Sequence, residues 1–140
     1  MALTLRQGDV FLYPYLWNWQ ADKGEAEGRK DRPVCLALPL RKVGLTHVFL
    51  LAITGTPPQQ GQRAIAIPEI EKRRAGLKQW KNGWIILGEC NYDIVEHSFC
   101  LDPSQPVLGR FSDAFTARIK TELRAIIESG ALARIDRTVS

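Results

Sequence analysis

The sequence contains few of the residues that build metal sites and disulfides. Its 140 residues include only three cysteines and two histidines. The cysteines are odd in number, lie in apolar segments and form no Cys-x-x-Cys pair, which excludes a disulfide-stapled scaffold. Neither His47 nor His97 stands at zinc-site spacing from a cysteine. We therefore expect a protein that holds no metal and needs no cofactor.

The chain also lacks long hydrophobic runs, internal repeats and low-complexity segments. No window approaches the length of a membrane span, and the opening MALTLRQGDVFLY has no charged region before an apolar run. These absences predict a cytoplasmic protein without membrane contact. A hydrophobic fraction of 45% and a charged fraction of 24% are ordinary for a globular chain. We expect one domain over residues 1–140, with 131–140 as a flexible tail.

Positive charge is in mild excess, with 19 Lys and Arg against 15 Asp and Glu. It collects in GRKDR, at Arg41 and Lys42, and in EKRRAGLKQWK. Each cluster stands between apolar segments, where loops are expected. The clusters are either a solvated loop surface or a site for an anionic partner.

Alternation of apolar, aromatic and polar residues predicts a series of short strands. They span residues 8–17, 33–40, 47–54 and 63–67, with two more around Asn91 and Tyr92. A short helix is expected after Pro68, and the clearest helix begins after the N-cap candidate Ser112 and ends at Gly130. Short strands followed by one helix indicate a mainly β fold, namely a small, partly open barrel with the C-terminal helix packed on it.

The stretch GRKDRPVCLALPL places a charged run directly before one of these strands. Strict alternation assigns Val34, Leu36, Leu38 and Leu40 to one face and Cys35, Ala37 and Pro39 to the other. Neither face is polar, so this strand is expected in the core. Pro33 suits the first position of a strand and would hold Arg32 at its rim. An arginine at that rim serves either solubility or a functional site.

Four segments, in this order, resemble the MazF/PemK-like toxins of bacterial toxin–antitoxin pairs, which share an SH3-like barrel with the gyrase poison CcdB. GDVFLYPY is similar to the family's opening Gly-Asp strand, and EGRKDRPVCLAL to its Gly…Arg-Pro strand. LLAITGT is similar to the strand that ends in Thr or Ser, and PVLGRFSDAFTARI to the approach to the last helix. The resemblance covers residues 8–127 and implies an SH3-like, partly open β-barrel.

The resemblance implies a metal-independent endoribonuclease that cuts single-stranded RNA in a sequence-dependent way. Such cleavage uses the 2′-hydroxyl of the RNA as nucleophile, so the enzyme must supply a base, an acid and donors for the phosphorane charge. Arg32 matches the arginine of the family's Arg-Pro motif and would bind the phosphate. Thr54 or Thr56 would match the family's hydroxyl residue. Both stay candidates, because Thr54-Gly55-Thr56 stands where the family has adjacent hydroxyl residues.

Four carboxylates are candidates for proton transfer. Glu25 or Glu27 would match the carboxylate that the family often carries before its Arg-Pro motif. The segment ECNYD replaces the family's Gln-x-Arg segment, which leaves Glu89 and Asp93 as possible acid–base groups.

The resemblance also suggests how RNA and partners would bind. Arg29 and Lys30 would contact RNA, while Tyr15 and Trp17 of the aromatic first strand would either stack on bases or be buried in a core or dimer interface. The family implies a homodimer and an acidic antitoxin segment that occupies the RNA groove. Two alternatives remain open: a CcdB-like toxin that binds a protein target without chemistry, or a catalytically silent barrel that binds only RNA or antitoxin.

Overall fold

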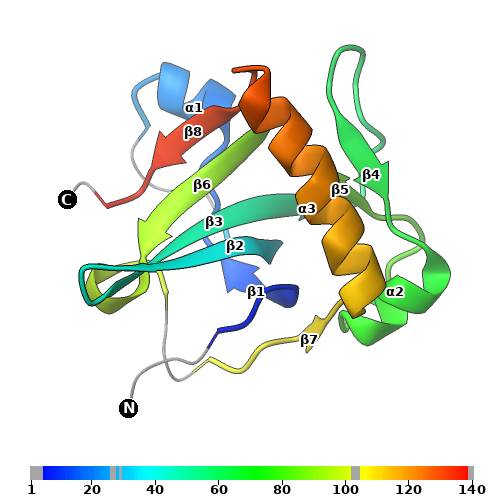
Figure 1. Cartoon of the computed structure of the whole chain (residues 1–140). Helices are drawn as coiled ribbons and strands as arrows, with labels where there is room; N and C mark the ends of the chain where they lie inside the picture. The colour runs from blue at the N-terminus through cyan, green and yellow to red at the C-terminus, as the bar shows by residue number, and fades with distance from the viewer. Residues whose placement is uncertain (1–4, 26–27, 29, 102–104, 139–140) are drawn as a thin grey trace.

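The computed structural model describes residues 5–25, 28, 30–101 and 105–138. Figure 1 shows a curled sheet with one long helix lying across it. In chain order the elements are β1 (Asp9–Tyr13), α1 (Asn18–Asp22), β2 (Arg32–Lys42), β3 (Leu45–Thr54), β4 (Ala64–Ala66), α2 (Glu69–Arg74), β5 (Trp84–Ile86), β6 (Glu89–Ile94), the 3₁₀ helix η1 (Val95–His97), β7 (Gly109–Arg110), α3 (Asp113–Glu128) and β8 (Ala133–Asp136). The prediction of a mainly β fold is confirmed.

An antiparallel sheet forms the centre of the fold. β2 pairs with β1 on one side and with β3 on the other, and β1 continues to β7. The other edge of β3 pairs with β6 at residues 47–50 and with β5 at residues 53–54. Because two successive strands share this edge, the sheet bends between them and curls into a half-barrel (Figure 1). β4 pairs with β5 in antiparallel orientation, and β8 pairs with β6 in parallel orientation.

Each face of the sheet carries its own hydrophobic cluster. The face under α3 includes Cys35 and Leu51, which share a cluster with Phe115 of α3, and we call it the helix face. The opposite face includes Tyr13, Tyr15, Val34, Leu36 and Leu50, and we call it the tyrosine face. The first half of β2 is therefore buried on both sides, as the apolar pattern predicts.

The long helix α3 has the start and the buried stripe that the sequence predicts. The Ser112 hydroxyl accepts a hydrogen bond from the Phe115 N–H at 3.1 Å, as an N-cap does. Gly130 has a φ of +75°, which suits the residue that ends a helix. The apolar side chains at helical spacing are buried against the sheet, namely Phe115, Ile119, Leu123 and Ile126. Ile127 is the exception and is exposed.

The second half of β2 departs from the predicted alternation. A register shift between Leu36 and Leu38 is a β-bulge, because Leu36 pairs with Leu50 whereas Leu38 pairs with Phe49. Leu36 lies on the tyrosine face, so the bulge turns Leu38 and Leu40 to the helix face. The prediction that these leucines share one face with Val34 is wrong, since one extra residue reverses every later side chain.

The structure also differs from the sequence prediction at the end of the first strand and at the C-terminal tail. The first strand ends at Tyr13 rather than at residue 17, and the chain enters α1 one residue after Trp17. Residues 133–136 form β8, which pairs with β6, so this part of the predicted tail belongs to the sheet. Neither difference follows from local pattern, because each depends on hydrogen bonds to residues distant in the sequence.

The segments GDVFLYPY and PVLGRFSDAFTARI, which lie far apart in the sequence, contact each other in the structure. Asp9 pairs with Arg110 between β1 and β7, and the Arg110 Nε donates to the Asp9 carboxylate at 2.7 Å. Only 1% of Asp9 is exposed, and its second oxygen accepts from the Arg6 N–H. Asp9 is therefore a structural carboxylate that ties β7, which precedes α3, to the first strand.

Candidate functional site

Arg32 and Thr54 lie at the same end of the β2–β3 ladder. Val34 pairs with Ala52 across these antiparallel strands, so Arg32 and Thr54 each lie two residues beyond the same pair. Residues two apart share a face, which puts both side chains on the tyrosine face. On the other side of β2, Arg32 is the direct partner of Tyr13. The structure thus places a cation and a hydroxyl that are 22 positions apart in the sequence at the same end of one strand pair.

Trp17 supports the guanidinium of Arg32. The Arg32 Cζ lies 5.5 Å from the centroid of the Trp17 ring, a distance at which a cation is attracted by an aromatic face. The Trp17 ring in turn makes an edge contact with Tyr15, with centroids 5.0 Å apart. Arg32, Thr54 and Trp17 are all half-buried. They lie at the boundary between the core and solvent, where a ligand can reach an ordered side chain.

Glu89 joins this group through Tyr15. Its carboxylate accepts hydrogen bonds from the Tyr15 hydroxyl at 3.1 Å and from the Asn18 N–H at 2.9 Å. Glu89 lies two residues beyond the Asn91–Leu50 pair of β6 and β3, level with Ala52 and on the tyrosine face. Burial raises the pKa of the Glu89 carboxyl, although the two hydrogen bonds act in the opposite direction. A carboxyl with a raised pKa is suited to exchanging protons nearer neutral pH.

The segment from Pro14 to Asn18, which carries Trp17, is held by Arg137, Asn91 and Glu89, which are distant in the sequence, and by Gln20 of the adjoining α1. The Arg137 Nη1 donates to the Pro14 carbonyl at 2.7 Å. The Asn91 side chain accepts from the Leu16 N–H at 2.9 Å and donates to the Leu16 carbonyl at 2.7 Å. The Trp17 N–H donates to the Gln20 side chain at 3.0 Å, and the Asn18 N–H donates to the Glu89 carboxylate at 2.9 Å. Trp17 is therefore a fixed support and not a free loop residue.

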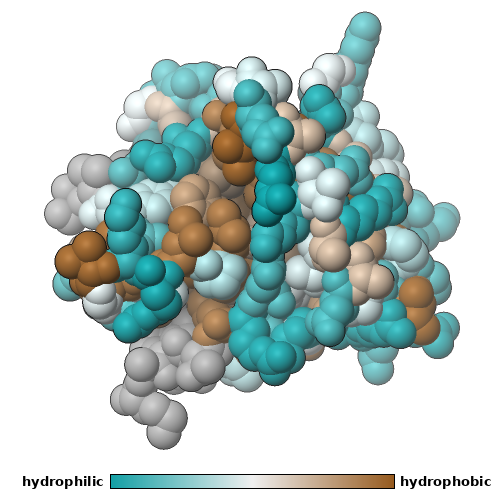
Figure 2. Space-filling view, in the orientation of Figure 1, coloured by the Kyte–Doolittle hydropathy of each residue, from teal (hydrophilic) through white to brown (hydrophobic). Residues whose placement is uncertain are grey.

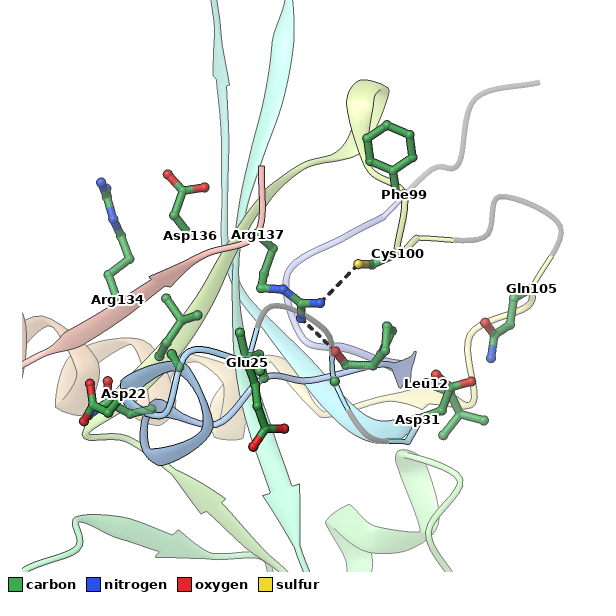
Figure 3. A pocket seen from close by; sticks show the side chains of 16 residues that line it. Leu12, Asp22, Glu25, Asp31, Phe99, Cys100, Gln105, Arg134, Asp136 and Arg137 are labelled. Atoms are coloured by element: carbon green, nitrogen blue, oxygen red, sulfur yellow. Dashed lines mark hydrogen bonds between the residues drawn. The ribbon is translucent and has the colours of Figure 1, made fainter. Parts of the chain in front are cut away.

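Arg137 is the residue of this region that the sequence did not indicate. Its guanidinium also contacts Asn91 at 3.0 Å and the Cys100 sulfur at 3.4 Å, and its Cζ lies 5.4 Å from the Tyr13 ring centroid. Figure 3 shows it reaching from β8 toward Cys100. The sequence predicts a flexible tail over residues 131–140, so it gives no sign that Arg137 is buried.

Asp93 proves to be a structural group. Only 1% of it is exposed, and its carboxylate accepts from the hydroxyls of Tyr13 (2.8 Å) and Ser98 (2.6 Å) and from the Ile94 N–H (2.8 Å). Burial, with the neighbouring Asp93 charge, raises the pKa of Tyr13. A carboxylate so enclosed cannot contact a substrate, which contradicts the prediction that Asp93 is an acid–base candidate.

A hollow of about 1130 Å³ lies between β1, α1, β8 and the residues Phe99, Cys100 and Gln105 (Figure 3). Its lining includes Arg134 and Arg137 but also four carboxylates, from Asp22, Glu25, Asp31 and Asp136. Carboxylates outnumber guanidiniums, so this hollow disfavours a phosphate backbone. Glu25 is one of the residues that line it.

The other predicted site residues have different outcomes. Tyr15 is 1% exposed, so the prediction that it stacks on RNA bases is wrong, and its ring serves the core. Thr56 lies beyond the end of β3, exposed, and its N–H donates to the Thr54 hydroxyl at 3.1 Å. Lys30 is exposed two residues before Arg32. Glu27 and Arg29 lie outside the described residues.

Among residues 5–25, 28, 30–101 and 105–138, no three His, Cys, Asp or Glu side chains cluster so as to hold a metal ion. In the same part of the chain, no helix has the length and apolar character needed to cross a membrane.

Burial raises the pKa of Cys35 and of Cys90 to about 12, so neither thiol is a ready nucleophile. The candidate chemistry therefore rests on Arg32, Thr54 and Glu89.

No protein-family model, no curated protein and no solved structure matches this chain. The candidate site therefore has to be judged on its own geometry and on the four motifs quoted above.

Proposed function

We propose that this protein is a metal-independent endoribonuclease of the MazF/PemK-like toxin type, with an SH3-like barrel, acting on single-stranded RNA in the cytoplasm. The observation that carries the proposal is the position of Arg32 and Thr54 at one end of the β2–β3 ladder, with Arg32 held over Trp17. Both residues come from motifs that resemble this family, and their proximity in space is what one shared site requires.

In the proposed reaction, the RNA 2′-oxygen attacks the adjacent phosphorus and the bond from phosphorus to the 5′-oxygen breaks. The products are a 2′,3′-cyclic phosphate and a free 5′-hydroxyl. Arg32 donates to the non-bridging oxygens as charge develops on the phosphorane, and the Thr54 hydroxyl donates beside it. Glu89 takes the proton from the 2′-hydroxyl, and solvent water gives a proton to the departing 5′-oxygen. Substrate, nucleophile and leaving group belong to one RNA strand, so this scheme needs no metal.

The proposal is tested by incubating the protein with a long unstructured RNA in EDTA and mapping the new ends. We expect cleavage by the parent, and a rate on the order of 100-fold lower for Arg32→Ala, because a charge-assisted contact to the transition state is lost. The Arg124→Ala variant, which changes an exposed arginine on α3, should cut at the parental rate. Cleavage by Arg32→Ala at the parental rate would show that the arginine assignment is wrong.

The fold of Arg32→Ala should be unchanged, because β2 is held by its apolar residues and its ladders with β1 and β3. Circular dichroism and thermal unfolding check this point. If the parent slows growth when expressed yet cuts no RNA, the protein-targeting alternative is favoured. If it neither slows growth nor cuts RNA but binds either RNA or antitoxin, the silent barrel is favoured.

The proposal includes two protein partners. An acidic antitoxin segment would occupy the surface near Lys30 and Arg32, so it should compete with RNA and bind more weakly as salt rises. The proposed homodimer is tested by sedimentation at micromolar concentration, where a monomer alone would count against it.

A further inference from the structure

Part of the helix face of the sheet is not covered by α3. Figure 1 shows α3 crossing the sheet at one side, while β2, β3 and their connecting hairpin extend past it. Cross-strand pairing there forms two adjacent rows, Leu38–Phe49–Tyr92 and Leu40–His47–Ile94. All six residues are half-buried or exposed, and Figure 2 shows hydrophobic side chains gathered beside α3 on this side. The bulge in β2 creates this surface, because it turns the two leucines toward it.

Three aromatic residues of these rows, His47, Phe49 and Tyr92, form what we call the aromatic platform. The rings of His47 and Tyr92 are nearly parallel, with an interplanar angle of 19° and centroids 5.8 Å apart, and a hydrogen bond joins the Tyr92 hydroxyl to His47 Nδ1. The Phe49 ring centroid is 5.3 Å from that of Tyr92. The Arg134 Cζ, from β8, lies 4.9 Å from the Tyr92 ring centroid. Flat rings and a guanidinium therefore meet at the solvent boundary.

Positive charge borders the aromatic platform. Lys42 is exposed and lies two residues after Leu40, on the same face of β2. Arg134 is also exposed. Asp136 is the acidic neighbour on β8, and its carboxylate accepts from the Thr138 N–H at 2.8 Å. Arg134 also lines the hollow that holds the Asp22, Glu25, Asp31 and Asp136 carboxylates, whereas Lys42 is not part of that lining. On the platform side, these two cations, in a chain of net charge +4, favour an anionic ligand.

We propose that the aromatic platform binds bases of single-stranded RNA, with Arg134 and Lys42 at the phosphates. Bases stack on aromatic rings and on guanidinium planes, and neighbouring cations hold the backbone without reading the sequence. A second copy of this chain fits the surface less well. In a twofold dimer that used it, Lys42 and Arg134 of both protomers would be brought together, and like charges oppose such contact.

This inference deepens the proposed function, on which it rests for the choice of RNA as ligand. The aromatic platform is distinct from the Arg32 site, since it lies on the opposite face of the sheet. His47 pairs with Leu40, eight residues along β2 from Arg32, which is a path of roughly 26 Å at 3.3 Å per residue.

The test uses a fluorescent 12-nucleotide 2′-O-methyl oligouridine, which cannot be cleaved because its 2′-oxygen is blocked. Binding is followed by fluorescence anisotropy. We expect Tyr92→Leu and Phe49→Leu each to weaken binding by about tenfold, since each removes one stacking surface. Arg134→Gln should weaken it several-fold and lower the salt dependence by about one phosphate contact. Phe99→Leu and Arg124→Gln are the matched controls, an exposed aromatic and an exposed arginine outside the platform, and should bind as the parent does.

Arg134→Gln keeps the test decisive if the leucine variants lose their fold, because Arg134 is exposed and its replacement leaves the core intact. The inference is overturned if folded platform variants and Arg134→Gln all bind the probe within twofold of the parent. It is also overturned if the variants convert a dimer into a monomer while each protomer still binds RNA normally, since a second copy would then be the occupant.

The failure of this inference is distinguishable from failure of the proposed nuclease. If the parent cuts no RNA in EDTA but the platform variants lose binding of the blocked probe, the nuclease proposal fails and the platform stands. If the parent cuts RNA and the platform variants bind normally, the platform fails and the nuclease stands.

Discussion

Arg137→Met should destabilise the whole fold, although it changes a residue only three positions before Ser140. Arg137 is 8% exposed and donates to the Pro14 carbonyl at 2.7 Å and to Asn91 at 3.0 Å. Methionine keeps a flexible apolar side chain in the same space but removes both donors. Asn91 still accepts from the Leu16 N–H, so the acceptor that loses its partner is the Pro14 carbonyl.

The size of the effect follows from these contacts. Each hydrogen bond from a charged group contributes about 1.5–3 kcal/mol, and a buried carbonyl without a partner costs about 1–3 kcal/mol. Removing the guanidinium also removes the cost of keeping that charge out of water, which offsets part of the loss. We expect a net loss of about 3 kcal/mol. With an unfolding entropy of about 2.1 cal/mol/K per residue over 140 residues, that loss lowers the Tm by roughly 10 °C.

Urea unfolding followed by tryptophan fluorescence measures this loss directly. The midpoint should fall while the m-value stays unchanged, because the surface exposed on unfolding is nearly the same. Arg124→Met, at an exposed position of α3, should leave the midpoint within the range of ordinary surface substitutions. A loss below about 1 kcal/mol for Arg137→Met would refute the view that this cation ties β8 to the Pro14 segment.

Three further predictions concern other positions. Gly28→Ala should lower the free energy of unfolding, measured in urea, by about 2 kcal/mol or more and cut RNA more slowly, because a Cβ there would lie 2.2 Å from the Pro14 carbonyl oxygen. Val43→Asn should raise the free energy of unfolding by about 1 kcal/mol, since Val43 has a φ of 54° and is 91% exposed. Glu89→Gln should gain stability relative to the parent as pH rises above about 4.3, the ordinary pKa of a glutamate. Burial raises the pKa of the folded Glu89, so its stabilising contribution is complete below the unfolded pKa and lost as pH rises through the folded one.

Each of these predictions has its own control. Gly88→Ala should be tolerated, because nothing lies within 4 Å of its added Cβ, so equal losses at Gly28 and Gly88 would refute the steric argument. If Val43→Asn has a free energy of unfolding no higher than that of the parent, the positive φ does not strain this hairpin. If the difference between Glu89→Gln and the parent is the same at every pH, the raised pKa does not contribute to folding.

Local pattern determined the elements whose signals lie within one segment. The spacing of Phe115, Ile119 and Leu123, with Ser112 before them, was enough to predict α3, because a helix satisfies its own backbone hydrogen bonds. The alternating apolar residues of 33–40 and 47–54 likewise predicted β2 and β3.

The bulge in β2 shows where local pattern fails. Strict alternation kept Leu38 and Leu40 with Val34, whereas the register against Phe49 and His47 turns them to the other face. Whether a strand carries an extra residue depends on the partner strand, and the partner is chosen by packing of the whole sheet. The aromatic platform could not be predicted for this reason.

The candidate site divides in the same way. The sequence by itself determined that Arg32 begins an apolar strand and that Thr54 ends another, with Thr56 just beyond it. Only the tertiary structure decided that Thr54 shares a face and a ladder end with Arg32, that Tyr15 is buried, and that Arg137 returns from the end of the chain to hold Pro14. The physical reason is that burial and long-range hydrogen bonds depend on contacts between segments far apart in the chain, and no local propensity encodes those contacts.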